Sequence, residues 1–325
     1  MSRLSDLASW ASRHRRLLGA AQLIVLAAFF ISLGWALRHE LHAAARDLDS
    51  ANLVLFALGC AALGAYYLVF VLGWMRILRE WGIELSYPVA LRAEMVSMLA
   101  KYIPGGVWTP AARVVAARRA GVTDAALVTS SMLLEAGLSA VSGVIVFVIA
   151  LPFVDNVDAP LAPLVIFGAV LAVLVQPRIF RPLAGKVLRR FGYAKELPNL
   201  RARTLSMLLV FYAGTWILGG LALWLLLRSV GAHPEAATIV FLGGTAAVGA
   251  IVAVLFVFAP SGLGPREASM YGLLLAVATP GQALGAVALN RLALTAVELL
   301  LFIVVGLVLR GATRRPSGPA ELTSP

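Results

Sequence analysis

The sequence is poor in the residues that build redox, metal and catalytic sites. It has one cysteine, Cys60, so no disulfide can form within the chain. Its four histidines, His14, His39, His42 and His233, lie in loops or near the ends of apolar runs, and none has metal-ligand spacing with another. We find no phosphate-binding GxxxxGK, no dinucleotide fingerprint and no convincing Ser-His-Asp set. The sequence therefore predicts no metal, no cofactor and no enzymatic activity.

Charged residues are also scarce, at 13% of the chain, while hydrophobic residues make up 61% and the mean hydropathy is +0.90. A soluble domain is usually about 25% charged and about 45–50% apolar. Several apolar runs approach the roughly 20 residues that a helix needs to cross a bilayer. The composition thus predicts an all-α integral membrane protein with many spans.

We expect about eight transmembrane helices, one for each apolar run: 17–37, 51–75, 124–151, 159–176, 204–227, 236–259, 265–279 and 282–309. The first run has 21 residues, longer than the roughly 7–15 of a signal peptide core, and is interpreted as an uncleaved anchor. The predicted organisation is a basic cytoplasmic N-terminus at 1–16, a single membrane domain at 17–310 and a disordered tail at 311–325.

The net charge of +11 is explained by topology and not by nucleic acid. With eight crossings and a cytoplasmic N-terminus, 23 of the 27 Lys and Arg residues fall on the cytoplasmic side. This asymmetry is what the positive-inside rule describes. It predicts a multi-pass protein of the cytoplasmic membrane with both termini in the cytoplasm.

Between the second and third runs the sequence predicts two short interfacial or re-entrant helices on the cytoplasmic side. The first has Pro88 in its first turn, and its apolar residues fall on one helical stripe that leaves Glu94 outside it. The second is expected to have Thr109 as its N-cap and Pro110 at its first position, and to end at Gly121.

Two similar Pro-Gly stretches break the helical pattern: KYIPGGVWTPAAR at 101–113 and FAPSGLGPREA at 258–268. Backbone outside a helix is costly in lipid, so it indicates a cavity, and breaks in both halves of a transporter point to its binding site. Arg113 and Arg266 follow the breaks and suit phosphate. An alternative to a binding site is that the Pro and Gly residues only form tight loops. The similarity of the two stretches also fits an internal structural repeat, whose symmetry the sequence does not resolve.

The predicted substrate-binding residues lie in the two Pro-Gly stretches or at a nearby buried acid. They are Lys101, Pro104, Gly105, Gly106, Arg113, Glu135, Pro260, Gly262, Gly264, Arg266 and Glu267.

Ionisable residues inside apolar runs are costly in hydrocarbon and are often functional. Glu135 has no local ion-pair partner and is the stronger functional candidate. Arg291 and Glu298 lie seven residues apart on one helical face and form a possible intramembrane ion pair. Trp74 lies near the end of its run and is interpreted as an interfacial anchor.

At these motifs the sequence resembles the transmembrane, flippase-type domain of lysylphosphatidylglycerol synthases. The likeness rests on KYIPGGVWTPAARVVAARRAGV, on the Glu of LLEAGLS and on PSGLGPREA, and it spans roughly residues 15–310. The sequence departs from the family pattern at Ala136, where an Arg is expected, and at Trp108 and Thr109, where Gly is common. The resemblance implies a stand-alone member that lacks the aminoacyl-transferase domain.

The resemblance and the broken helices together predict a flippase-like transporter. Its cargo would be an anionic, aminoacylated or sugar-linked polyprenyl-phosphate lipid. Two alternatives remain: a non-transporting scaffold for a lipid-modifying enzyme, with the basic loop 177–203 as contact surface, and an enzyme acting on a lipid phosphate. The expected partners are membrane lipids and a lipid synthase or glycosyltransferase, with no nucleic acid; the lipid and the oligomeric state are not predicted.

Overall fold

The computed structural model describes residues 51–102, 108–154, 161–190, 197–256 and 259–312. Within these ranges the chain is helical, without β-strands, which confirms the predicted all-α class. The first apolar run, the stretch Pro104–Gly106 and most of the tail lie outside the described residues.

The α-helices follow one another along the chain, with short 3-10 turns at some of their ends. They are α4 (Leu53–Glu80), α5 (Tyr87–Ala100), α6 (Trp108–Arg119), α7 (Ala125–Ala150), α8 (Leu161–Leu174), α9 (Pro177–Arg190), α10 (Ala202–Ser229), α11 (Ile239–Leu255), α12 (Pro265–Leu274) and α13 (Pro280–Ala312).

Five of the described helices are long and apolar enough to cross a membrane, and a sixth span results if α8 and α9 count as one. The five are α4, α7, α10, α11 with its preceding turn, and α13, which correspond to five of the expected runs. The expected fourth span, 159–176, corresponds to the 14-residue helix α8, and the expected loop 177–203 begins with α9, which bends away from α8 by 80°. The expected seventh span is α12, whose 10 residues are too few to cross a bilayer.

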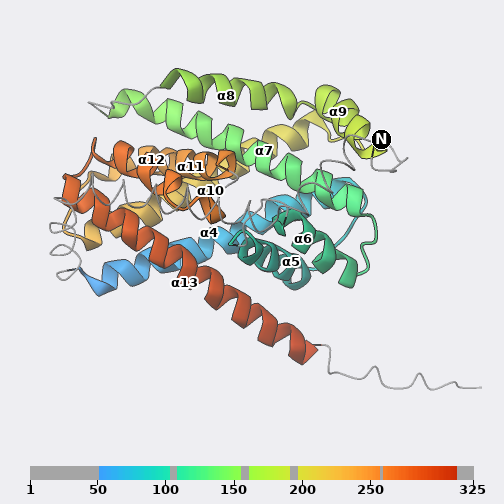
Figure 1. The fold of residues 1–325 in the computed structure, drawn as a ribbon, viewed down its shortest axis with the longest axis horizontal. Helices are drawn as coiled ribbons and strands as arrows, with labels where there is room; N and C mark the ends of the chain where they lie inside the picture. The colour runs from blue at the N-terminus through green and yellow to red at the C-terminus, as the bar shows by residue number, and fades with distance from the viewer. Residues whose placement is uncertain (1–50, 103–107, 155–160, 191–196, 257–258, 313–325) are drawn as a thin grey trace, which may run out of the picture.

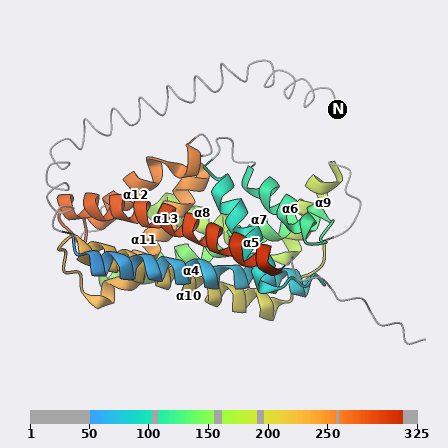
Figure 2. The same cartoon turned by 90° about the horizontal axis from the view of Figure 1, so that it is seen from below.

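The long helices pack into a bundle, and the short helices fill the gaps between them. Helices α4 and α10 lie side by side, α11 packs against both α10 and α7, and α8 covers α7 (Figure 1). Helices α5 and α6 pack on each other, and α5 also contacts α13 (Figure 2). Helix α12 packs between α11 and α13. The two Pro-Gly stretches therefore adjoin short helices within the bundle.

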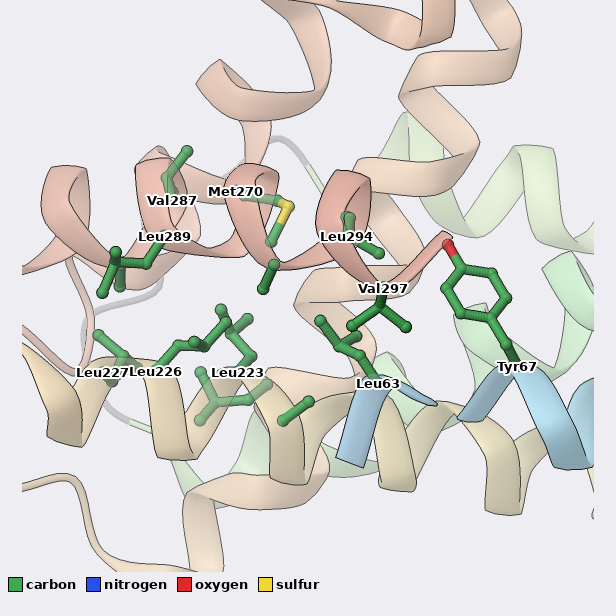
Figure 3. Close-up of a cluster of buried hydrophobic side chains, with 14 of the residues drawn as sticks. Leu63, Tyr67, Leu223, Leu226, Leu227, Met270, Val287, Leu289, Leu294 and Val297 are labelled. Carbon is green, nitrogen blue, oxygen red and sulfur yellow. The ribbon is translucent and has the colours of Figure 1, made fainter. Parts of the chain in front are cut away.

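The hydrophobic core lies where α4, α10 and α13 face one another. Figure 3 shows Leu63 of α4, Leu223 and Leu226 of α10 and Val297 of α13 directed into this space, with Met270 of α12 nearby. The burial of these apolar side chains holds α13 against α4 and α10.

The ends of the short helices are largely those that the sequence predicted. Pro88 lies in the first turn of α5. Gly121 follows α6 with a φ of +90°, a conformation that favours glycine. The expected N-cap of α6 is wrong, since the helix begins at Trp108 and Thr109 is its second residue.

Helices α10 and α11 approach so closely that their backbones touch. A Cβ added at Gly220 would overlap the carbonyl oxygen of Ile239 and lie 2.5 Å from the backbone nitrogen of Gly243. Gly220 and Gly243 therefore serve close helix packing, because a Cβ at either position would overlap the backbone of the neighbouring helix.

We expect Gly220→Ala to lower stability by about 1–3 kcal/mol, because the overlap is with backbone and no side-chain rotation relieves it. Gly214 lies on the same helix with no atom within 4 Å of an added Cβ, so Gly214→Ala should change stability by less than about 1 kcal/mol. Thermal unfolding of both variants in detergent measures the difference. Equal melting temperatures would contradict the close crossing.

Candidate functional site: a charged junction of two broken helices

The two Pro-Gly stretches, distant in sequence, meet in the structure. The backbone N–H of Ser261 donates to the carbonyl oxygen of Lys101 at 3.0 Å. Lys101 caps the C-terminus of α5, and Ser261 precedes α12. Ser261, Gly262 and Gly264 have φ values of 53°, 66° and 92°, so this segment turns sharply before α12 begins. Both breaks therefore belong to one junction.

Near this junction, Arg113 of α6 is buried between two glutamates. Its side chain is 2% exposed. One terminal nitrogen, Nη1, lies 2.6 Å from Oε2 of Glu135 on α7, and the other, Nη2, contacts Oε2 of Glu94 on α5. The third nitrogen, Nε, donates to the hydroxyl of Ser97 at 3.1 Å. All three guanidinium nitrogens thus have protein partners.

Two aromatic side chains enclose this ion cluster. The guanidinium carbon of Arg113 lies 4.8 Å from the ring centre of Trp74, a cation–π distance. The indole N–H of Trp74 donates to the hydroxyl of Ser131 at 2.9 Å. The interpretation of Trp74 as an interfacial anchor is wrong, since the residue is fully buried. Tyr212 of α10 donates its hydroxyl to Oε1 of Glu135 at 3.4 Å.

Glu298 on α13 forms the centre of a second cluster and is 1% exposed. Its Oε1 atom contacts both Nζ of Lys101 and the hydroxyl of Tyr67. Its Oε2 atom accepts from the hydroxyl of Tyr102 at 3.1 Å. Figure 3 shows Tyr67 extending from α4 toward α13. Lys101 keeps 23% of its side chain exposed, so this cluster is more accessible than that of Arg113.

The expected ion pair between Arg291 and Glu298 does not form, because each side chain has a different partner. Arg291 lies 3.4 Å from Oε1 of Glu267 and donates to the carbonyl oxygen of Ser261 at 3.2 Å. Glu267 in turn accepts the backbone N–H of Gly264 at 2.7 Å through Oε2, which caps α12. Arg291 and Glu267 thereby tie α13 to the second Pro-Gly stretch.

Arg266 differs from the other three basic residues at the junction. Within the described part of the chain it makes no ion pair, and its buried Nε atom has no hydrogen-bond partner. Its side chain runs along α11, where its Cγ atom lies 3.4 Å from a Cβ added at Gly249. Arg266 therefore keeps hydrogen-bonding capacity that no described residue uses.

The structure brings most of the predicted site residues together. Lys101 joins the cluster of Glu298, while Gly262, Gly264, Arg266 and Glu267 form the turn before α12 and its first residues. Pro260 lies in the same turn. The predicted residues Pro104, Gly105 and Gly106 lie outside the described residues.

Helix α5 connects the two clusters, and the sequence interpretation missed its role. Glu94 and Lys101 lie seven residues apart on α5, which is two helical turns or about 10 Å. Glu94 is fully buried although it was expected outside the apolar stripe. Its position three residues after Leu91 and four before Met98 places it on that stripe. The sequence spacing could therefore have predicted that Glu94 is buried. The same spacing places Glu94 on the face of α5 that contacts Arg113.

The junction can bind ions but shows no metal-binding arrangement. It gathers four basic side chains and four carboxylates: Lys101, Arg113, Arg266, Arg291, Glu94, Glu135, Glu267 and Glu298. Among the described residues, no group of three or more His, Cys, Asp or Glu is placed to hold a metal ion. Charged side chains at this distance from one another can exchange ion-pair partners and protons.

A bundle of apolar helices with two breaks meeting at a charged junction defines the chain as a polytopic α-helical membrane protein. Residues 17–305 match the family model of the lysylphosphatidylglycerol synthase TM region, and the chain belongs to this family. The resemblance seen in the motifs is thereby confirmed. A comparison with curated proteins found no match.

We expect Arg113→Gln to destabilise the protein by about 3–5 kcal/mol, because it leaves two buried carboxylates without their cation. The matched control is Arg118→Gln on the exposed face of the same helix, which should change stability by no more than about 0.5 kcal/mol. Thermal unfolding in detergent measures both.

The triple variant Arg113→Gln, Glu94→Gln and Glu135→Gln separates charge from packing. It should recover most of the lost stability, since no uncompensated charge stays buried. A triple variant less stable than Arg113→Gln would show that the side-chain packing, and not the charge, holds these helices.

Proposed function

We propose that the protein is a flippase-like transporter that moves a lipid with a phosphate-bearing headgroup across the cytoplasmic membrane. The observation that carries this proposal is the contact between Lys101 and Ser261, which joins the two broken segments beside several partly exposed charged side chains. Polar backbone at membrane depth is stable only where protein or a wet cavity surrounds it. Such a place suits a headgroup that must cross apolar surroundings.

Three basic residues are suited to hold the phosphate. Arg266 has an unused Nε donor within the described part of the chain. Lys101 and Arg291 keep 23% and 19% of their side chains exposed. The incoming phosphate would replace the carboxylates of Glu298 and Glu267 as the ion-pair partner of these basic residues. Its geometry suits a guanidinium. Lys101 and Arg291 are thus paired when the path is empty, while the unpaired Arg266 leaves the path with a net positive charge.

Arg113 has a different role in this proposal from the one the sequence suggested. Its three nitrogens already have partners and its side chain is 2% exposed. A phosphate would have to displace two carboxylates from a buried place, which costs several kcal/mol. We therefore assign Arg113 and Glu135 to holding the short helices in position, and the phosphate to Arg266, Lys101 and Arg291.

The proposed cargo is an anionic, aminoacylated or sugar-linked polyprenyl-phosphate lipid. Membership in the lysylphosphatidylglycerol synthase TM region family supports a role connected with membrane lipids. The sequence has no nucleotide-binding motif, so we propose a gradient or a downhill lipid supply as the energy source and no enzymatic activity. The proposed cytoplasmic termini rest on the excess of Lys and Arg in alternate loops of the eight-crossing prediction.

A scaffold for a lipid-modifying enzyme is a second candidate because of α9. This helix exposes Ile179, Leu183 and Val187 at 39%, 49% and 51%, spaced four residues apart on one face. Five basic residues lie on the same short helix, which bends away from α8 by 80°. A basic amphipathic helix of this kind suits an anionic membrane surface or an acidic partner.

Reconstitution into liposomes tests the transport proposal. Fluorescent lipids labelled on the headgroup, one lipid class at a time, are scored for accessibility to a membrane-impermeant quencher. We expect one class to cross faster with the wild type than in empty liposomes, and at least tenfold more slowly with Arg266→Gln. The control Arg92→Gln changes an exposed Arg on α5 and should cross at the wild-type rate.

If no lipid class crosses faster than in empty liposomes, the transport proposal fails and the scaffold becomes the preferred function. If Arg266→Gln and Arg92→Gln both match the wild type, a lipid crosses but Arg266 does not hold its phosphate.

A further inference from the structure

The proposed lipid path leaves one feature of the junction unexplained, which is the unequal charge around Arg113. Glu94 and Glu135 are 0% and 4% exposed, and the one cation in contact with them is Arg113, at 2%. Two carboxylates and one guanidinium leave one negative charge without compensation. Burying an unpaired charge costs several kcal/mol, so a group in this situation takes up a proton or a partner.

The unpaired oxygen can be identified. Both carboxylate oxygens of Glu94 are buried without a hydrogen-bond partner among the described residues; Oε2 forms the ion pair with Nη2 of Arg113, and Oε1 forms none. The second carboxylate, Glu135, uses both oxygens, one for Arg113 and one for the hydroxyl of Tyr212. Protonation of the cluster at Oε1 of Glu94 would therefore displace no existing partner.

Among the described residues, the helices around the cluster place no second cation in contact with its carboxylates, and the charge of Lys101 acts on Glu94 only from a distance. Lys101 lies two turns along α5 and is in contact with Glu298 of α13. Arg291, also on α13, is paired with Glu267. From α4, Tyr66 interacts electrostatically with both glutamates of the cluster, and Tyr67 donates to Glu298. Helices α8 and α11, which pack against α7, carry no ionisable residue.

Arg266 is the remaining basic residue at the junction, and it does not reach this cluster. It contacts neither Glu94 nor Glu135. Arg118 and Arg119 of α6 are exposed on the opposite face from Arg113. The excess negative charge is thus balanced by no further contacting cation among the described residues.

We propose that Glu94, Arg113 and Glu135 form a proton-binding site that holds one exchangeable proton shared between the two carboxylates. A proton is the cation that fits, because it needs no space of its own in a fully buried cluster and forms the missing O–H donor. In such a pair the proton belongs to the cluster and not to either residue. Neutralised in this way, the cluster carries no net charge.

The same geometry links the proton to movement of α5. The cluster is enclosed, so the proton exchanges when α5 and α6 separate from α7. Helix α5 also ends at Lys101, which we place in the lipid path, so proton exchange and headgroup binding involve one moving element. This coupling rests on the proposed function, whereas the proton site itself does not.

Infrared difference spectroscopy during a pH titration of the purified protein in nanodiscs tests the proton site. We expect the wild type to show the carbonyl stretch of one protonated carboxyl at neutral pH, which disappears as the pH rises. Glu94→Gln and Glu135→Gln should each abolish this band, because the remaining carboxylate is balanced by Arg113. Glu84→Gln, which changes an exposed glutamate before α5, should leave the band in place.

The absence of the band in the wild type, or its persistence in either cluster variant, would overturn the proposal. Folding of the variants gives a second readout. A glutamine has the shape of a protonated glutamate, so Glu94→Gln should unfold at the wild-type temperature at neutral pH and lose less stability than the wild type at alkaline pH. A Glu94→Gln protein that fails to fold would equally overturn the proposal.

Liposomes with an imposed pH gradient separate this proposal from that of lipid transport. If lipid crosses and its rate follows the gradient in the wild type but not in Glu94→Gln, both proposals are supported. If the infrared band behaves as expected and no lipid crosses, the proton site stands and the transport proposal fails.

Discussion

The position of the short helices depends on one buried guanidinium. Arg113 of α6 reaches Glu94 of α5 and Glu135 of α7, and it stacks on Trp74 of α4. Neither α5 nor α6 is long enough to be held by the bilayer as a span, so their place in the bundle must come from contacts of this kind. Because a buried charge tolerates few alternative partners, the cluster also fixes the orientation of both helices.

Helix α5, which the Arg113 cluster holds in place, positions Lys101 beside the second Pro-Gly stretch. There Glu298, Arg291 and Glu267 connect α13 with the turn before α12, and Ser261 bonds directly to the end of α5. The two clusters differ in what they can do. The cluster of Arg113 is closed and has an excess of negative charge, whereas the basic residues at the other end are partly exposed. We interpret the first as a proton site that supports the helices and the second as the place where a headgroup binds.

Much of this arrangement can be predicted from the sequence, and the reasons for the failures are physical. Apolar runs and Pro and Gly positions predict the all-α membrane fold and the limits of α5, because these signals are local. Charges in apolar runs identify Glu135, Arg291 and Glu298 as residues that need partners, and the first Pro-Gly stretch identifies Arg113. The partners themselves are set by tertiary packing, so the pair on one face of α13 was wrong. Run length alone also counted α12 as a span, although it is a short helix held between α11 and α13.

The most direct test of the central claim is photo-crosslinking of a lipid headgroup to the protein in membranes. A phospholipid with a photoreactive group on its headgroup is activated in proteoliposomes, and the attached peptides are mapped by mass spectrometry. If a headgroup passes through the junction, crosslinks should occur at the end of α5 near Lys101 and in the turn before α12 around Arg266. Crosslinks confined to the lipid-facing surfaces and to the ends of the long helices would contradict the claim that the two broken segments form a lipid path.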